Sequence, residues 1–267
     1  MNAPILIAAA DDPIVSRYRL RDRQLAPILP DPSAPDGLFV AEGDLVIERA
    51  LARGYRIDSV LADDRPRFTV LDQLDADVPV FLGGAAVRAA LTGYGVQLDI
   101  IALFHRRPLP PASMIRSSAR RVAVVEAVDN PANLGAIVRS AVALGIDGMI
   151  VEAKGADPYA RRCVRASMGT SLQLPTAQVP NVGDEIQAML ADGFAVFALT
   201  PDPTADSLDD VRAYFHDRAA IVLGSERAGL SPEVLASGAR PVRIPMAAGV
   251  DSLNVAAAAA VAFYALR

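Results

Sequence analysis

Three stretches of the chain combine glycines with side chains that bind ligands, and each follows a short apolar run. The first reads Asn133-Leu-Gly-Ala-Ile-Val-Arg139, and the second reads Leu223-Gly-Ser-Glu-Arg-Ala-Gly229. The third begins with Ile244-Pro-Met246 and continues in Ser252-Leu-Asn254. Asparagine and serine can cap helices, glycines let a backbone approach a ligand closely, and a guanidinium group fits phosphate or carboxylate. These residue types predict a pocket lined largely by backbone that receives an anionic substrate.

Other catalytic signatures are missing from the sequence. No Gly-x-Gly-x-x-Gly follows an apolar strand, which disfavours a dinucleotide fold, and no Gly-x-Ser-x-Gly surrounds Ser225, which disfavours a hydrolase. His105 and His216 are isolated, and no cluster has the spacing of metal ligands. We therefore expect no metal.

The elements that must position these loops alternate between strands and helices, which predicts an α/β fold. Apolar residues occur in consecutive pairs, such as Val124-Val125 and Ile221-Val222, as in strands covered on both faces of a parallel sheet. Ligands of open α/β sheets bind at the carboxyl ends of the strands, where the three stretches lie. We predict strands at Val122–Val128, Gly148–Glu152, Ala195–Leu199, Ala219–Leu223 and Pro241–Ile244, and helices at Leu134–Leu144, Tyr159–Ser167, Asp184–Asp192 and Pro232–Leu235.

The chain divides into two predicted domains. Residues 1–105 form a compact α/β unit, residues 106–121 are rich in Pro, Ser and Arg and predict a linker, and residues 122–267 form the larger unit. An alanine-rich helix closes the chain, with Asp251 or Ser252 as its predicted cap. Alanine is a good helix former and allows another backbone to pack closely.

The charge pattern points to RNA rather than to a membrane. Net charge is −5, but Lys154 is the only lysine, so the basic residues are almost all arginine. The arginines cluster, and each cluster could be a solvated face or a phosphate-binding patch. The candidates for RNA binding, besides Arg139, are Arg106, Arg107, Arg161, Arg162 and Arg165.

The single cysteine, Cys163, and an N-terminus without a basic leader indicate a cytoplasmic protein, and we expect Cys163 to be a packed side chain. No apolar run is long enough to span a bilayer. The sequence therefore predicts a cytoplasmic protein without a membrane partner.

Taken in order, the three stretches resemble the three motifs of the SpoU–TrmH family of RNA ribose 2′-O-methyltransferases, in the SPOUT superfamily. The resemblance covers roughly residues 122–267, and Val164-Arg-Ala-Ser-Met-Gly169 looks like the family's spacer between the first two motifs. More weakly, Gly37-Leu-Phe-Val-Ala-Glu-Gly43 looks like the start of the family's L30e-like substrate-binding domain. Val96–Ala102 departs from the His-Gln-Gly-type segment of such domains.

The resemblance implies a C-terminal trefoil knot, a homodimer and S-adenosylmethionine as methyl donor. It implies catalytic roles for Arg139, Glu226, Ser252, Asn254 and Asn133. Arg139 would either remove the proton of the 2′-hydroxyl or grip the substrate phosphate and the nascent alkoxide, and we favour the second role. Glu226 would orient Arg139, and Ser252 and Asn254 would position ribose and cofactor. Asn133 would bind near the target nucleotide or brace the motif loop. Residues that would hold the cofactor are Leu199, Thr200, Gly224, Ile244, Met246, Ser252 and Leu253.

The target and two other functions stay open. Ribosomal RNA is favoured over transfer RNA, because the first domain resembles a ribosomal-protein fold. A non-catalytic RNA-binding or assembly protein on the same fold is the second interpretation, although intact motif residues argue against it. A nucleotide-dependent α/β enzyme of another kind is the third, and the missing glycine fingerprint disfavours it.

Overall fold

The computed structural model describes residues 3–26, 37–64, 68–92, 99–211, 217–247, 249–250 and 252–266. It divides the chain into two compact units. The first unit comprises Met1–Pro108 and Tyr159–Leu172, and the second comprises Leu109–Pro158 and Gln173–Arg267. The segment Tyr159–Leu172 packs with the first unit, which differs from the predicted division at residue 105.

The first unit is built on a mixed five-stranded sheet of order β1-β4-β3-β5-β2. β5 pairs antiparallel with β2 and β3, whereas β4 is parallel to β3 and β1. The strands are β1 (Ile5–Leu6), β2 (Leu38–Glu42), β3 (Ile57–Ala62), β4 (Val80–Leu82) and β5 (Ile100–His105). The helices are η1 (Pro13–Arg19), α1 (Asp22–Leu25), α2 (Asp44–Ala52), η2 (Thr69–Gln73), α3 (Ala85–Thr92), α6 (Arg161–Ala166) and η3 (Thr170–Leu172).

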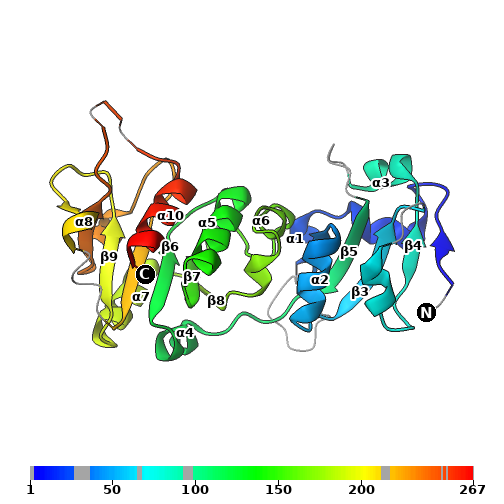
Figure 1. The fold of residues 1–267 in the computed structure, drawn as a ribbon, viewed down its shortest axis with the longest axis horizontal. Helices are drawn as coiled ribbons and strands as arrows, with labels where there is room; N and C mark the ends of the chain where they lie inside the picture. Colours follow the sequence, from blue (N-terminus) through cyan, green and yellow to red (C-terminus); the bar gives the residue numbers. More distant parts are fainter. Residues whose placement is uncertain are drawn as a thin grey trace. The chain divides into compact units, whose positions relative to one another are not determined.

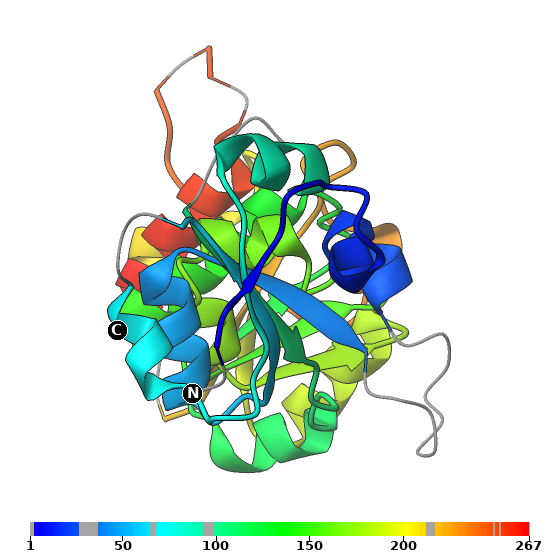
Figure 2. The same ribbon diagram turned by 90° about the vertical axis from the view of Figure 1, so that its right-hand side faces the viewer.

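Both faces of this first sheet are covered, as its alternating apolar residues require. Leu38 and Val40 contribute to a core with residues of η1 and α1, while Phe39 on the opposite face stacks on Phe104 with ring centroids 5.5 Å apart. Figure 2 shows η1 and α1 in dark blue on one side of the sheet and α2 on the other. Tyr159 also contacts Phe39, and burial raises the pKa of the Tyr159 hydroxyl. This aromatic contact joins the Tyr159–Leu172 segment to the first unit.

The second unit is built on a seven-stranded sheet of order β10-β12-β9-β11-β6-β7-β8. Every pairing in it is parallel, which confirms the prediction from consecutive apolar pairs. The strands are β6 (Arg121–Val125), β7 (Gly148–Glu152), β8 (Thr176–Val179), β9 (Ala195–Leu199), β10 (Asp206–Ser207), β11 (Ala219–Leu223) and β12 (Arg240–Arg243). The predicted bounds of β7, β9 and β11 are confirmed, whereas β8 and β10 were not predicted, because they are short and only partly apolar.

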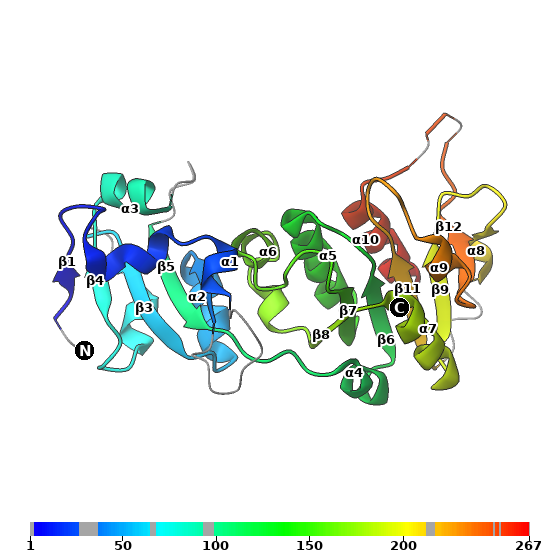
Figure 3. The same ribbon diagram turned by 180° about the vertical axis from the view of Figure 1, so that it is seen from behind.

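Helices cover both faces of the parallel sheet. Its helices are α4 (Ala112–Ser118), α5 (Pro131–Ala143), α7 (Val182–Ala191), α8 (Leu208–Val211), α9 (Pro232–Leu235) and α10 (Val255–Leu266). α5 and α10 lie side by side on one face (Figure 1). Viewed from behind, α7 and α9 lie on the other (Figure 3). The small residues of α10 permit its close approach to α5.

Helix caps differ from the sequence prediction at two places. Asn130, rather than Asn133, caps α5, because its side chain accepts a hydrogen bond of 3.0 Å from the amide of Ala132. Asn254 caps α10 by accepting 2.9 Å from the amide of Ala256, whereas Ser252 was predicted and Asp251 lies outside the described residues. Residues 96–98 of the divergent Val96–Ala102 stretch and His216 also lie outside them. The cap at Asn130 leaves the Asn133 side chain available for another partner.

The predicted linker 106–121 contains helix α4, which belongs to the core of the second unit. Ile115 of α4 is 2% exposed and packs so closely on β7 that a Cβ at Gly148 would lie 2.6 Å from its Cγ2 atom. Arg116 pairs with Glu185 of α7 at 2.5 Å and with Asp192 at 2.7 Å. The polar composition hid this helix, because one buried isoleucine carries most of its apolar contact.

The α4 packing predicts a clear difference between two neighbouring side chains. Ile115→Ala should lower the free energy of unfolding by about 2–5 kcal/mol, because it removes buried methylene groups and leaves a cavity. Met114→Ala is the matched control, since Met114 lies on the same helix but is 56% exposed. Urea unfolding followed by circular dichroism measures both variants. Equal effects of the two substitutions would contradict the docking of α4.

Candidate cofactor pocket and catalytic residues

A cavity of about 650 Å³ lies in the second unit, where β9, β11 and β12 end. Its volume falls within the range of about 300–1,000 Å³ that is usual for small-molecule sites. The carboxyl edge of a parallel sheet is also the position expected for such a site. All the residues predicted to hold the cofactor line this cavity: Leu199, Thr200, Gly224, Ile244, Met246, Ser252 and Leu253.

The wall after β11 is a tight loop that only glycine permits at its first position. A Cβ on Gly224 would lie 2.4 Å from the carbonyl carbon of Gly229 and 2.5 Å from the amide nitrogen of Leu230. Ser225 and Gly229 exchange backbone hydrogen bonds of 3.2 and 3.0 Å, and Gly229 adopts a φ of 67°. The loop therefore presents a rigid, backbone-rich surface to the cavity.

A buried carboxylate that the sequence analysis missed supports this loop. Glu126 follows β6, is 7% exposed and accepts a hydrogen bond of 2.9 Å from the amide of Ser231. Its own amide donates to the carbonyl of Leu223 at 2.8 Å, so the ends of β6 and β11 are tied together. The signal in the sequence was an acidic residue directly after the apolar run Val122–Val125, because buried carboxylates need hydrogen-bond partners.

The loop after β9 forms a second wall and is held by β12. The amide of Thr200 donates to the carbonyl of Val242 at 2.9 Å, and Arg243 Nε donates to the carbonyl of Ala205 at 3.1 Å. Asp202 accepts hydrogen bonds from the hydroxyl and the amide of Thr204, and these bonds lower the pKa of its carboxyl. The turn is therefore braced by an ionised carboxylate.

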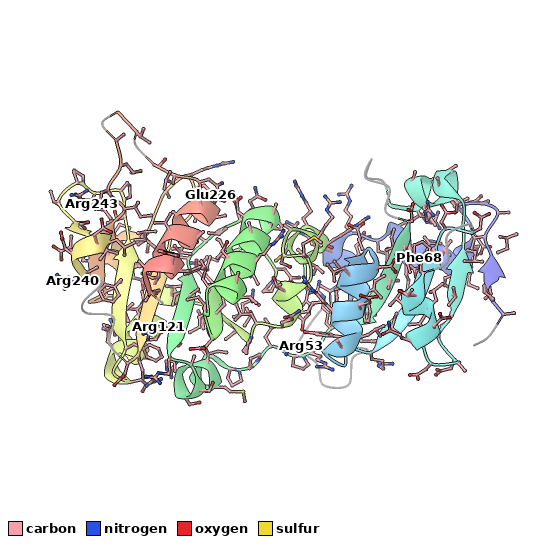
Figure 4. The ribbon with its side chains drawn as sticks, viewed as in Figure 1. Arg53, Phe68, Arg121, Glu226, Arg240 and Arg243 are labelled. Carbon is pink, nitrogen blue, oxygen red and sulfur yellow. The ribbon has the colours of Figure 1, made fainter. Side chains whose placement is uncertain are left out.

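Three of the predicted catalytic residues form a hydrogen-bonded chain at the mouth of the cavity. Asn133 donates through Nδ2 to Glu226 Oε1, and Asn254 Nδ2 donates to Asn133 Oδ1 at 3.4 Å. Glu226 and Asn254 both line the cavity. Figure 4 shows Glu226 near the start of α10, at the opposite end of the sheet from Arg121. The chain thus joins side chains from all three motif stretches.

Arg139 takes no part in the hydrogen bonds that join Asn133, Glu226 and Asn254. It lies on α5, its side chain is exposed, and it does not line the cavity. The sequence analysis paired Arg139 with Glu226, but in the structure Glu226 accepts from Asn133, and Arg139 makes no ion pair with any described residue. In the structure Glu226 therefore contacts Asn133 and makes no ion pair with Arg139. An exposed guanidinium without an internal partner remains free for a substrate anion.

The cavity suits S-adenosylmethionine by the chemistry of its lining. Leu199, Ile244, Met246 and Leu253 offer apolar surface to an adenine ring, and Thr200, Ser252 and Asn254 offer groups that hydrogen-bond hydroxyls. Glu226 provides a negative charge beside a cationic sulfonium or ammonium group. A side chain at position 224 would collide with the backbone of Gly229 and Leu230, so this wall of the cavity depends on the glycine.

The arginines proposed for RNA binding are mostly occupied inside the first unit. Arg161 pairs with the buried carboxylate of Glu42, which Arg165 also approaches at 3.5 Å. Arg106 Nε donates to the carbonyl of Leu38 at 2.9 Å, and Arg107 caps the end of α2 by donating to the carbonyls of Arg53 and Gly54. Arg162 alone of these five is exposed with no side-chain hydrogen bond or ion pair to a described residue. Buried Cys163 of α6 is packed as predicted.

The SpoU rRNA Methylase family model matches residues 120–264 of this chain. The chain belongs to this family. An uncharacterized tRNA/rRNA methyltransferase of Mycobacterium bovis is 37% identical over 257 residues, which cover 95% of this chain and 88% of that protein. The 23S rRNA (guanosine(2553)-2′-O)-methyltransferase RlmP of Bacillus subtilis is 26% identical over 231 residues, which cover 86% of this chain and 88% of that protein.

Solved structures agree with this assignment. The AdoMet-bound rRNA methyltransferase of Sinorhizobium meliloti superimposes with a TM-score of 0.77 at 28% identity, over 98% of this chain and 97% of that one. The family resemblance of the three motifs is therefore confirmed. The protein is an S-adenosylmethionine-dependent RNA methyltransferase of the SpoU family.

Metal-binding clusters and membrane-spanning helices are absent from the described residues. No group of three or more His, Cys, Asp or Glu side chains gathers there in a way that could hold a metal ion. No helix in the described part of the chain is long and apolar enough to cross a membrane.

The close approach of Gly224 to the backbone of Gly229 predicts that adding a methyl group at position 224 disturbs the pocket. Gly224→Ala should weaken S-adenosylmethionine binding at least about tenfold, because its Cβ would push the backbone of Gly229 into the cavity. Gly84→Ala is the control, since a Cβ there meets nothing within 4 Å. Calorimetric titration with the cofactor measures both. Normal affinity in Gly224→Ala would show that the loop does not shape the cofactor site.

Proposed function

We propose that this protein methylates a ribose 2′-hydroxyl of ribosomal RNA. The observation that carries the proposal is the meeting of Asn133, Glu226 and Asn254 at the mouth of the pocket. The name of the similar B. subtilis protein, a 23S rRNA 2′-O-methyltransferase, supports ribosomal RNA as the target class. Transfer RNA is the alternative target, and methyl mapping separates the two. Such a substrate fits a cytoplasmic enzyme.

The proposed mechanism depends on positioning. Bound S-adenosylmethionine supplies a methyl group on a positively charged sulfur. The apolar lining and Gly224 loop hold the cofactor and exclude water, and Ser252 and Asn254 position the ribose beside it. Asn133 holds the Glu226 carboxylate, and the pair braces the mouth of the pocket. In this proposal the catalytic contribution is alignment of the acceptor hydroxyl.

Arg139 is the residue we assign to the charge that develops on the acceptor. Its exposed guanidinium can grip the adjacent phosphate and the nascent alkoxide. A guanidinium group stays protonated in proteins, so Arg139 donates hydrogen bonds and does not act as a base in this proposal. The proton of the 2′-hydroxyl then leaves through the phosphate that Arg139 binds.

The first unit is proposed to bind RNA and to be L30e-like. Its mixed sheet and exposed arginines, including Arg17, Arg19, Arg21 and Arg23, support this role. Because Arg106, Arg107 and Arg161 are engaged in contacts within the unit, we assign the RNA contact among α6 residues to Arg162. The domain that binds substrate is then the whole first unit, including Tyr159–Leu172.

A trefoil knot is proposed for the end of the second unit. β12 lies between β9 and β10, while α10, which follows it, returns to pack on α5 and β11. This path takes the chain end past the segment between β9 and β11, as threading requires. Knots are rare exceptions among folds, and the small side chains of α10 suit passage through a narrow loop.

Methyl mapping is the direct test of the proposed function. Ribosomal and transfer RNA from cells with and without the gene are compared for 2′-O-methyl groups, and the purified protein is then supplied with the unmodified RNA. We expect a ribosomal RNA site to lose its methyl group without the gene and to regain it in vitro. A site that changes only in transfer RNA would move the proposal to the alternative target.

Arg139→Ala should reduce single-turnover methyl transfer about a hundredfold or more, while cofactor affinity stays near normal. The loss corresponds to one charge-assisted contact made chiefly in the transition state. Arg139→Lys should rescue little, because an ammonium group cannot make the two-pronged contact. Arg120→Ala is the control, since Arg120 is 69% exposed and directly precedes β6. Near-normal turnover in Arg139→Ala would refute the assignment.

A homodimer that uses α10 is proposed from two exposed apolar side chains. Val261 and Tyr264 are 44% and 49% exposed, although α10 is otherwise packed on the second unit. Light scattering should show a dimer, and Tyr264→Arg should shift it toward monomer by placing charge in the contact. A wild-type monomer at micromolar concentration would overturn the proposal.

A further inference from the structure

Arg227 has no role in the fold or in the chemistry described above. It directly follows Glu226 at the tip of the loop after β11, its side chain is exposed, and it lines the cavity. Among the described residues that line this cavity, Glu226 and Arg227 are the charged ones. Glu226 is held by Asn133, whereas the guanidinium of Arg227 makes no hydrogen bond or ion pair with any described residue.

Most other cations of the second unit are engaged in internal contacts. Arg116 and Arg240 pair with aspartates, Arg121 donates to the carbonyl of Leu266, and Arg243 donates to the carbonyl of Ala205. Arg218 and Arg120 likewise have carbonyl partners, and Lys154 pairs with Glu152. Within the described part of the unit, Arg139 and Arg227 are therefore the two guanidinium groups left without a partner.

The backbone under Arg227 is held from both sides. Ser225 and Gly229 exchange two backbone hydrogen bonds across the loop, and the amide of Ala228 donates to Ser225 Oγ at 3.3 Å. The contact of Gly224 with the Gly229 backbone prevents the loop from shifting inward. A guanidinium on such a fixed loop loses less conformational entropy when it binds an anion.

Arg227 and Arg139 belong to the two segments that the contact between Asn133 and Glu226 joins. Arg227 is the residue next to Glu226, and Arg139 lies six positions beyond Asn133 on α5, which is about 9 Å along a helix axis. An RNA strand carries a phosphate on each side of every ribose. Two exposed guanidinium groups on segments that meet at the pocket therefore suit the two phosphates of one acceptor nucleotide.

We propose that Arg227 binds the backbone phosphate on the far side of the methylated nucleotide from the phosphate held by Arg139. This inference rests on the proposed function, since it assumes an RNA acceptor at the pocket mouth. The exposed position of Arg227 at the loop tip suits a phosphate on a strand outside the cavity better than the carboxylate of a cofactor inside it. Arg227 is thus a substrate-binding residue, and its contact is electrostatic.

The test uses full-length Arg227→Ala and Arg227→Lys, with Arg240→Ala as matched control because Arg240 pairs with Asp206 and does not line the cavity. The probe is protein-free ribosomal RNA from cells that lack the gene. In Arg227→Ala the KM for RNA should rise about tenfold, and the slope of log binding constant against log salt should fall by about 1. Cofactor affinity and melting temperature should not change. Arg227→Lys should keep the salt slope, because a lysine still neutralises a phosphate.

Unchanged RNA affinity and salt slope in Arg227→Ala would overturn the inference. A weaker affinity for S-adenosylmethionine with unchanged RNA affinity would overturn it too, and would assign Arg227 to the cofactor carboxylate. Failure of the wild-type protein to methylate the RNA would instead contradict the proposed function, while the salt dependence of RNA binding would still test Arg227.

Discussion

The site depends on one hydrogen-bonded contact between segments that are far apart in the chain. Asn133 lies in the first turn of α5, Glu226 lies on the loop after β11, and Asn254 caps α10. Asn133 is half-buried, whereas Glu226 and Asn254 are exposed, and each hydrogen bond favours the positions of the two residues that it joins. The contact can form because Asn130 takes over the cap of α5. The three motifs therefore become one pocket mouth only through this chain of amides and carboxylate.

Backbone geometry defines the pocket that this mouth opens into. Gly224 touches the backbone of Gly229 and Leu230, and the buried Glu126 holds the amide of Ser231 just beyond them. The wall is therefore rigid without depending on large side chains. A wall of this kind can recognise the shape of a cofactor while its exposed tip stays free to meet a second substrate. A rigid wall also suits a reaction whose rate enhancement comes largely from alignment of the two substrates.

Some arginines have partners within the protein and others do not, and the sequence alone does not tell the two groups apart. Arg107 and Arg161 look like the other clustered basic residues, yet one caps α2 and the other pairs with buried Glu42. Removing Arg161 would leave the buried Glu42 carboxylate with only the longer contact to Arg165, which is costly in a buried environment. Arg139 and Arg227 differ because the described structure offers them no internal partner. Within the described part of the second unit, the charge without an internal partner is thus carried by Arg139 and Arg227.

The sequence by itself determined the parallel sheet and the residues of the pocket. Consecutive apolar pairs such as Ile221-Val222 can be buried only when both faces are covered, and the glycine loops follow those strands directly. Tertiary structure alone decided that α4 joins the core through Ile115, that Tyr159–Leu172 packs with the first unit, and that Glu226 bonds Asn133 rather than Arg139. Local pattern reports which face of an element is apolar, whereas the partner of a polar side chain is set by which distant segment folding brings within about 3 Å.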